Sequence, residues 1–266
     1  MSLLPEIIFD IFLRLPVKPL LHFIKAHLNR SIETNSHKKL VLDGHAPTFP
    51  QLYALDFDDG LKQPVELDDP LKHSHGWFGY HISGSCSGLL LLLGENTLKT
   101  VKLGLWNPFT KRYKILTDPA VSIIWSSNYR RCDSFGLGYD DTSNDYRVVR
   151  ILQEMQREVW IYSLRSNSWR KLDVWCELSQ GDMGVFVNGV LYFHGKNLET
   201  IVAFDIATET FCTIPLPECY IPQGFRHTRG KHMKDSKQYQ VISFDHSSTI
   251  CWESLVSLGD DAIPVD

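Results

Sequence analysis

The sequence is poor in the features that mark secreted, membrane-spanning or zinc-binding proteins. Its six cysteines are scattered over 266 residues without a Cys-x-x-Cys pair, which argues against a disulfide scaffold or a zinc knuckle. The longest unbroken aliphatic run, Leu89 to Leu93, is far shorter than the roughly 20 residues of a membrane-spanning helix. Glu6 and Asp10 interrupt the apolar N-terminal residues, so we expect no signal peptide. We therefore expect a soluble protein of the cytoplasm or nucleus that has no membrane partner.

A strong excess of charge of either sign is also missing. The chain has 27 Lys and Arg against 31 Asp and Glu, for a net charge of -4. This balance gives no support to nucleic-acid or membrane binding, and we expect no nucleic-acid partner. With 43% hydrophobic residues, the chain is long enough for one large domain and a small module.

The residue patterns of active sites and metal centres are missing as well. His73, His75 and His81 could bind a metal, but no cysteine or ordered carboxylate set lies near them, so we interpret them as surface or turn histidines. Asp56 to Gly60 lacks the ligand spacing of an EF-hand and reads as an acidic turn. We find neither a glycine-rich phosphate loop nor a nucleophile elbow. We therefore expect no catalytic site, no cofactor and no metal.

Two further polar clusters also favour turns and loops over chemistry. Asp140 to Asp145 is rich in Asp, Ser and Asn, which indicates a hairpin turn and not a pair of catalytic carboxylates. A basic patch around Gly230 could contact phosphate or an acidic substrate, but we interpret it as a solvated loop. The patch consists of Arg226, His227, Arg229, Lys231, His232, Lys234 and Lys237.

An apolar segment with a helical pattern occupies residues 3–24. Pro5 suits a first helical turn, where its missing N–H has no partner, and Pro16 ends the helix. The apolar residues between them are spaced by three or four positions, which gathers them on one face. These are Leu4, Ile7, Ile8, Ile11 and Leu15. A helix of about ten residues is marginal alone in water, so we expect it to pack against a partner or against its own domain.

From Leu40 onward the sequence predicts an all-β region. Short β-type runs alternate with Gly, Pro, Asp and Asn, and Asn188-Gly189 is a strong hairpin signal. We expect strands at 40–42, 52–57, 65–67, 88–93, 101–106, 135–139, 146–152, 158–164, 185–187, 190–193 and 201–206.

Within this region three segments align without gaps. Residues 106–116, 162–172 and 204–214 each have an aromatic, a second aromatic seven positions later and an aliphatic three positions further on. Turn-forming residues lie between the two aromatics, so we interpret each segment as a strand, a tight turn and a returning strand. The aromatic pairs are Trp106 with Tyr113, Tyr162 with Trp169, and Phe204 with Phe211. Hairpins that recur at such intervals favour β-propeller blades over an irregular β-sandwich.

The N-terminal segment and the β region together resemble a known family. Leu4-Pro5-Glu6-Ile7-Ile8 through Arg14-Leu15-Pro16-Val17-Lys18 resembles the first half of an F-box in the form common in plants. The β region is similar to the F-box-associated, kelch-like domain of the same plant proteins. Its matching motifs are Gly84 to Leu90, Leu105 to Pro108, Phe135 to Asp140, Tyr146 to Arg150, Val202 to Asp205, Tyr53 to Asp56 and Val65 to Asp68.

This resemblance implies a substrate-recognition subunit of a Skp–cullin–F-box ubiquitin ligase. The F-box would dock on a Skp-type adaptor and through it on a cullin, and the propeller-like domain would capture a protein substrate. The residues that match the adaptor-facing half of the motif are Leu4, Pro5, Ile7, Ile8, Ile11, Leu15 and Pro16. Alternatively, these residues pack onto the β domain, and the chain is a stand-alone binding propeller that has lost adaptor binding. A propeller enzyme such as a glycosidase or an oxidase is the third hypothesis.

The chain departs from the family pattern in two places. Phe23 runs almost directly into Ile24 to Arg30, so the Val-x-Lys-x-Trp segment and the third helix of the F-box are missing and the F-box is truncated. The sequence also ends soon after Trp252, and we expect the propeller to close incompletely or irregularly. The predicted fold is mainly β, a kelch-like β-propeller preceded by a short α-helical F-box remnant. Its parts are a partial F-box at 1–24, a tether at 25–36, the propeller domain at 37–258 and a tail at 259–266.

Overall fold

The computed structural model describes most of the β region and confirms that it is built from strands. In the described residues the regular elements are all β-strands, and no helix there is long and apolar enough to cross a membrane. The predicted helical remnant at 1–24 and the tether at 25–36 lie outside the described part of the chain. The described residues are 38–44, 51–56, 63–67, 77–96, 101–116, 133–153, 158–179, 181–196, 200–216, 248–252, 258–259 and 262–264.

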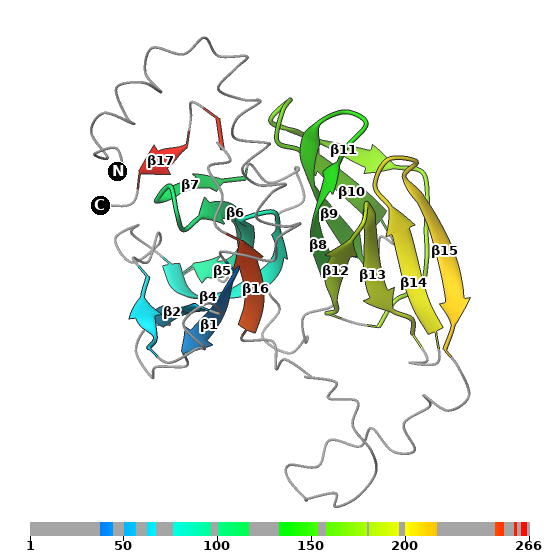
Figure 1. Ribbon diagram of the computed structural model, residues 1–266. Helices are drawn as coiled ribbons and strands as arrows, with labels where there is room; N and C mark the ends of the chain where they lie inside the picture. The colour runs from blue at the N-terminus through cyan, green and yellow to red at the C-terminus, as the bar shows by residue number, and fades with distance from the viewer. Residues whose placement is uncertain are drawn as a thin grey trace, which may run out of the picture. The chain divides into compact units, whose positions relative to one another are not determined.

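The chain divides into two compact units, Met1–Ile124 with Thr249–Asp266, and Trp125–Ser248. The first unit holds a four-stranded sheet of order β16-β1-β2-β3 and a five-stranded sheet of order β17-β7-β6-β5-β4 (Figure 1). Their strands are β1 (Lys38–Gly44), β2 (Gln51–Asp56), β3 (Val65–Glu66), β4 (Trp77–Cys86), β5 (Leu89–Asn96), β6 (Val101–Asn107), β7 (Arg112–Ile115), β16 (Ser248–Trp252) and β17 (Ile263–Pro264).

The second unit is built on one eight-stranded sheet of order β11-β10-β9-β8-β12-β13-β14-β15. It consists of two antiparallel four-stranded meanders, and a short parallel pairing of β8 with β12 joins them at Met183↔Phe135 and Gly184↔Gly136. Four-stranded meanders that meet along their first strands are the arrangement of adjacent propeller blades, which agrees with the predicted fold. The strands are β8 (Ser134–Asp140), β9 (Asp145–Leu152), β10 (Glu158–Ser163), β11 (Ser168–Leu172), β12 (Met183–Val187), β13 (Val190–His194), β14 (Thr200–Asp205) and β15 (Thr210–Pro215).

The core of the second unit joins its two meanders. Aliphatic side chains from β9 and β10 and aromatic and aliphatic side chains from β13 and β14 form one buried cluster. Burying such side chains is the main favourable term in folding, so the two meanders stabilise each other. The cluster consists of Val149, Ile151, Val159, Ile161, Leu172, Leu178, Leu191, Phe193, Val202, Phe204 and Ile206.

Glycines permit the close approach at the junction of β8 with β12. A Cβ atom on Gly184 would lie 2.6 Å from Phe193 Cζ, and one on Gly136 would lie 2.8 Å from Leu191 Cδ1. Such distances are too short for carbon–carbon contact, so any larger residue there would displace a core side chain. The glycines of Phe135-Gly136-Leu137-Gly138 thus serve packing.

Strand β4 was not predicted, and its pairing gives the reason. It pairs with β5 over ten residues, but the register shifts between Trp77 and Tyr80 and again between Ile82 and Gly84. Each irregularity breaks the alternation of inward and outward side chains by which a strand is recognised in a sequence.

The first sheet takes one strand from late in the chain. Strand β16 lies beside β1, although about 200 residues separate them. Pairing of an early with a late strand is how a propeller ring covers strand edges. The expectation that the ring closes incompletely stays a prediction.

Candidate interaction site at the hairpin turns

The three predicted repeats are antiparallel hairpins, as the sequence indicates. In each, the two aromatics are direct cross-strand partners: Trp106↔Tyr113, Tyr162↔Trp169 and Phe204↔Phe211. The ring centroids are 5.3 Å apart in the second pair and 4.7 Å apart in the third, with tilted ring planes. Tilted aromatic pairs at this distance contribute beyond the area that they bury. The spacing of seven positions between the two aromatics therefore indicates which residues pair across each hairpin.

The structure contains a fourth hairpin of the same kind that the repeat alignment missed. Tyr139 of β8 pairs with Tyr146 of β9, again seven positions apart, and their ring centroids are 4.8 Å apart. The signal is present in the sequence as an aromatic, an acidic turn and a second aromatic. Val149 stands three positions beyond Tyr146, so this segment follows the full pattern of the three repeats.

One polar residue caps each of these turns. It follows the first aromatic directly, and its side-chain oxygen accepts a backbone N–H of the turn, which replaces a ladder hydrogen bond. The four bonds are Phe109 N to Asn107 Oδ1 at 3.0 Å, Thr142 N to Asp140 Oδ1 at 2.9 Å, Ser166 N to Ser163 Oγ at 3.1 Å and Thr208 N to Asp205 Oδ1 at 2.8 Å. The prediction that Asp140 to Asp145 form a hairpin turn is confirmed.

Each turn also contains one residue in the left-handed region. These are Lys111 (φ 51°), Asn144 (φ 54°), Asn167 (φ 51°) and Glu209 (φ 58°), each five positions after the first aromatic. Asparagine tolerates this conformation, whereas glutamate and lysine adopt it at a cost. The two asparagines also accept bonds from the first tyrosine of their hairpins, Tyr139 Oη at 2.5 Å and Tyr162 Oη at 2.6 Å.

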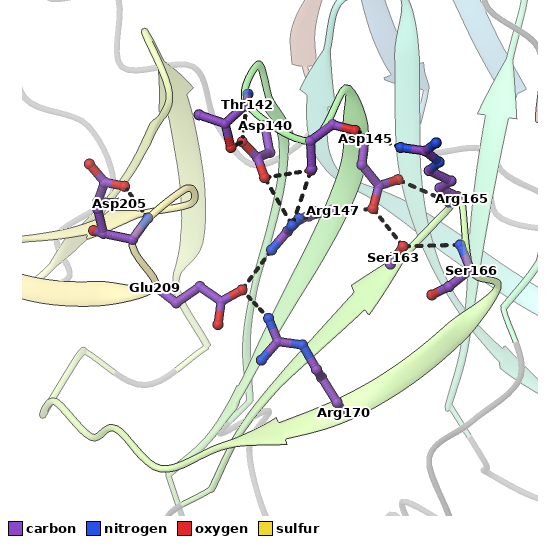
Figure 2. Close-up of polar contacts among 12 residues, drawn as sticks. Asp140, Thr142, Asp145, Arg147, Ser163, Arg165, Ser166, Arg170, Asp205 and Glu209 are labelled. Atoms are coloured by element: carbon purple, nitrogen blue, oxygen red, sulfur yellow. Dashed lines mark hydrogen bonds and ion pairs between the residues drawn. The ribbon is translucent and has the colours of Figure 1, made fainter.

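At the turn end of the second unit, the side chain of Arg147 connects the two meanders (Figure 2). Arg147 lies in β9, and its Nη1 donates to Glu209 Oε1 at 2.6 Å, in the turn between β14 and β15. Its Nη2 lies 2.9 Å from Asp140 Oδ2, and its Nε lies 3.9 Å from Asp145 Oδ2. Arg170 of β11 also donates to Glu209 Oε1. We call Asp140, Asp145, Arg147, Arg170 and Glu209 the turn-end network.

Hydrogen bonds surround the aspartates of the turn-end network, and those of Asp140 favour its charged form. Burial of Asp140 disfavours its charge, but bonds from Ser143 and Thr142 outweigh this and lower the pKa of Asp140 below its ordinary value. Asp145 accepts from Ser163 Oγ at 2.5 Å and from Arg165 N at 2.9 Å. Buried charges are tolerated only when they are paired in this way.

The turn-end network leaves two arginines at the surface. The guanidinium of Arg165 donates to Ser143 O at 3.0 Å, and both Arg165 and Arg170 are exposed. Both arginines belong to the β10–β11 hairpin, and their partners Ser143 and Glu209 lie in the turns of two other hairpins of the same unit. Rigid hairpins with exposed polar tips are suited to recognising another protein.

A second polar cluster lies at the opposite end of the same strands. Gln153 Nε2 donates to Ser134 Oγ at 3.1 Å and to Ser179 O at 2.8 Å, so it links the end of β9 to the start of β8. Nearby, His194 Nδ1 lies 3.1 Å from Asp182 Oδ1. This hydrogen bond raises the pKa of His194 above its ordinary value, although burial opposes the shift.

The residues predicted to bind an adaptor lie outside the described part of the chain, as do the basic patch around Gly230 and two of the three clustered histidines. The third, His81, lies in β4. In the described residues no group of three His, Cys, Asp or Glu could hold a metal ion. Asp56, at the start of the predicted acidic turn, ends β2, and its Oδ2 lies 3.5 Å from Lys39 Nζ.

Comparison with known proteins identifies related sequences. Residues 51–247 match the family described as the F-box associated beta propeller domain. F-box protein CPR1 of Arabidopsis thaliana is 28% identical over 259 residues, which cover 80% of this chain and 60% of that protein. An F-box/kelch-repeat protein of the same plant is 28% identical over 150 residues, 53% of this chain and 40% of its own length. The chain thus spans at most 60% of these relatives.

Proposed function

Since the chain belongs to the family that carries the F-box associated beta propeller domain, we propose that it is the substrate-recognition subunit of a Skp–cullin–F-box ubiquitin ligase. The observation that carries this proposal is the family match over residues 51–247, together with relatives that are named F-box proteins. In this role the chain recruits a protein substrate for ubiquitination and carries out no chemistry itself.

In the proposed complex the two parts of the chain have separate tasks. The N-terminal residues Leu4 to Pro16 bind a Skp-type adaptor with the apolar face that includes Ile8 and Leu15, and the adaptor connects the chain to a cullin. The β region presents rigid hairpins to the substrate. The proposed location is the cytoplasm or nucleus, where thiols stay reduced. In the described part of the chain, Cys86, Cys176 and Cys212 take part in no disulfide.

The alternative is a stand-alone binding propeller that has lost its adaptor. The shortened F-box pattern after Phe23 favours this second function, because a small helical module has little stability to spare. In that case Leu4 to Pro16 pack onto the β region, and the turns still bind a partner protein.

Co-purification with a Skp-type adaptor separates the two functions. The full chain is co-expressed with the adaptor, together with the variants Ile8→Asp and Leu15→Asp and the control Val65→Asp. Val65 is 63% exposed in β3, so its substitution places the same charge at a surface position of the β region. We expect the unmutated chain and the control to retain the adaptor and the two N-terminal variants to lose it. If the unmutated chain is soluble and folded but retains no adaptor, the ligase function is excluded and the stand-alone function remains.

A further inference from the structure

The outer strands of the three repeat hairpins occupy equivalent positions, and they differ in what lies beside them. Strands β7, β11 and β15 carry the second aromatics Tyr113, Trp169 and Phe211. Strands β11 and β15 are the two edges of the eight-stranded sheet, whereas β7 is followed by β17. An outer strand in this fold can thus be an edge or receive one more strand.

The pairing of β7 shows how an added strand is held. Strand β17 runs antiparallel to it, with Ile263 opposite Tyr113 and Pro264 opposite Arg112. Arg112 Nη2 also donates to Ala262 O at 2.8 Å. A short extended segment from far along the chain is therefore accepted beside the second aromatic of the repeat.

Strand β7 accepts β17 although it carries Arg112 and Lys114, and Arg112 bonds the added strand. Strand β11 differs from β7, because its charged side chains are already engaged by carboxylates of the same unit. It carries Arg170 and Lys171, which are bound by Glu209 and by Glu158 Oε1, the latter at 2.6 Å from Lys171 Nζ. Charged residues on an edge strand are a common protection against pairing with another chain, because the added strand would cover or displace them.

Strand β15 has no such protection. Its residues Thr-Phe-Cys-Thr-Ile-Pro carry no charge, and all except Phe211 are exposed, with Ile214 at 41%. In the described part of the chain it pairs with β14 alone and ends the sheet. It thus combines an edge of high β-propensity with apolar side chains on which a neighbour can pack.

We propose that β15 is a docking edge that takes an extended, uncharged segment of a protein substrate as an added antiparallel strand. The proposal rests on the proposed function for the identity of that protein as a substrate. Main-chain hydrogen bonds supply the affinity of such an addition, and alternate side chains supply the selectivity. By equivalence with Ile263 and Tyr113, an aliphatic residue of the segment lies opposite Phe211. A charged segment would be disfavoured, because β15 offers no counter-charge.

The test uses the full chain and a capped, uncharged peptide, acetyl-Thr-Ala-Ile-Pro-Val-Thr-amide, which carries the sequence of residues 262–265 between threonines. Binding is followed by NMR chemical-shift changes of the ¹⁵N-labelled protein. We expect saturable binding, with the largest shifts in β15, and a loss of about tenfold in affinity for Ile214→Lys and for Cys212→Lys. A peptide with aspartate in place of both threonines should bind more weakly.

Val185→Lys is the matched control. Val185 is 62% exposed in β12, which lies three strands from β15 in the same sheet, and we expect this variant to bind as the unmutated chain does. No saturable binding by the unmutated chain would overturn the docking edge, as would full binding by both edge variants. Equal losses for Val185→Lys and Ile214→Lys would also overturn it, in favour of docking on the sheet face. Adaptor binding is measured on the same samples: if it fails while the peptide binds, only the proposed ligase function is lost.

Discussion

Arg147 and Glu209 form an ion pair of 2.6 Å between two hairpins that are 62 residues apart in the chain. The pair is largely buried, with exposed side-chain fractions of 14% and 21%. Glu209 adopts a left-handed conformation that costs a glutamate free energy. Its side chain thereby reaches both Arg147 and Arg170, so a strained turn residue connects two meanders of one sheet.

Replacing Glu209 by Gln should destabilise the second unit. The substitution keeps the shape but leaves two arginines without their shared carboxylate, and we expect a loss of about 1–3 kcal/mol in the free energy of unfolding. Urea unfolding followed by tryptophan fluorescence measures this loss. The control is Glu177→Gln, which removes an exposed ion pair with Lys196 and should cost less than about 0.5 kcal/mol. Equal effects of the two variants would contradict a connecting role for Glu209.

Gly184→Ala should destabilise the protein by crowding Phe193. The new methyl group would lie 2.6 Å from Phe193 Cζ in a packed core, and overpacking of this kind costs about 1–3 kcal/mol. Gly104→Ala is the matched control, since its nearest contact, Lys114 O, lies at an ordinary 3.5 Å. Thermal unfolding of both variants compares them. A melting temperature for Gly184→Ala equal to that of the control would show that the junction of β8 with β12 is loosely packed.

Asn167→Ala should cost more stability than Asn167→Gly. Both variants lose the bond from Tyr162 Oη, but only alanine also carries the penalty of a Cβ in the left-handed region, about 1 kcal/mol. The comparison of the two urea midpoints isolates the conformational part. If alanine and glycine gave the same midpoint, the turn would have rearranged in the variants.

His194 should make stability depend on pH. Its hydrogen bond to Asp182 raises its pKa in the folded chain above the ordinary 6.5. A raised pKa means that the stabilisation is fully present below pH 6.5 and is lost as the pH rises through the folded value. The stability difference between the unmutated chain and His194→Gln should therefore be larger at pH 5.5 than at pH 8, as urea unfolding at both pH values would measure. The effect is small, because the side chain is 64% exposed. A difference that grew toward high pH would refute the assignment.

Much of the β architecture was predictable, because the signals for hairpins are local. The aromatic spacing, the capping residues and the turn formers lie within about eleven residues of one another in segments 106–116, 162–172 and 204–214. The hairpin at Tyr139 and Tyr146 was predictable from the same spacing of two aromatics around a turn. Strand β4 was not, because its register shifts remove the alternation on which strand prediction depends.

The sequence by itself determined the class of fold, the hairpin register and the family. These follow from near neighbours: an aromatic can pair only with the residue that its turn brings opposite. The tertiary structure alone decided which hairpins meet. That Glu209 reaches Arg147, that β17 lies beside β7 and that β15 ends its sheet all depend on the packing of segments far apart in the chain. A sequence pattern does not reveal which distant segments meet, because packing selects partners by shape and buried area and not by their order along the chain.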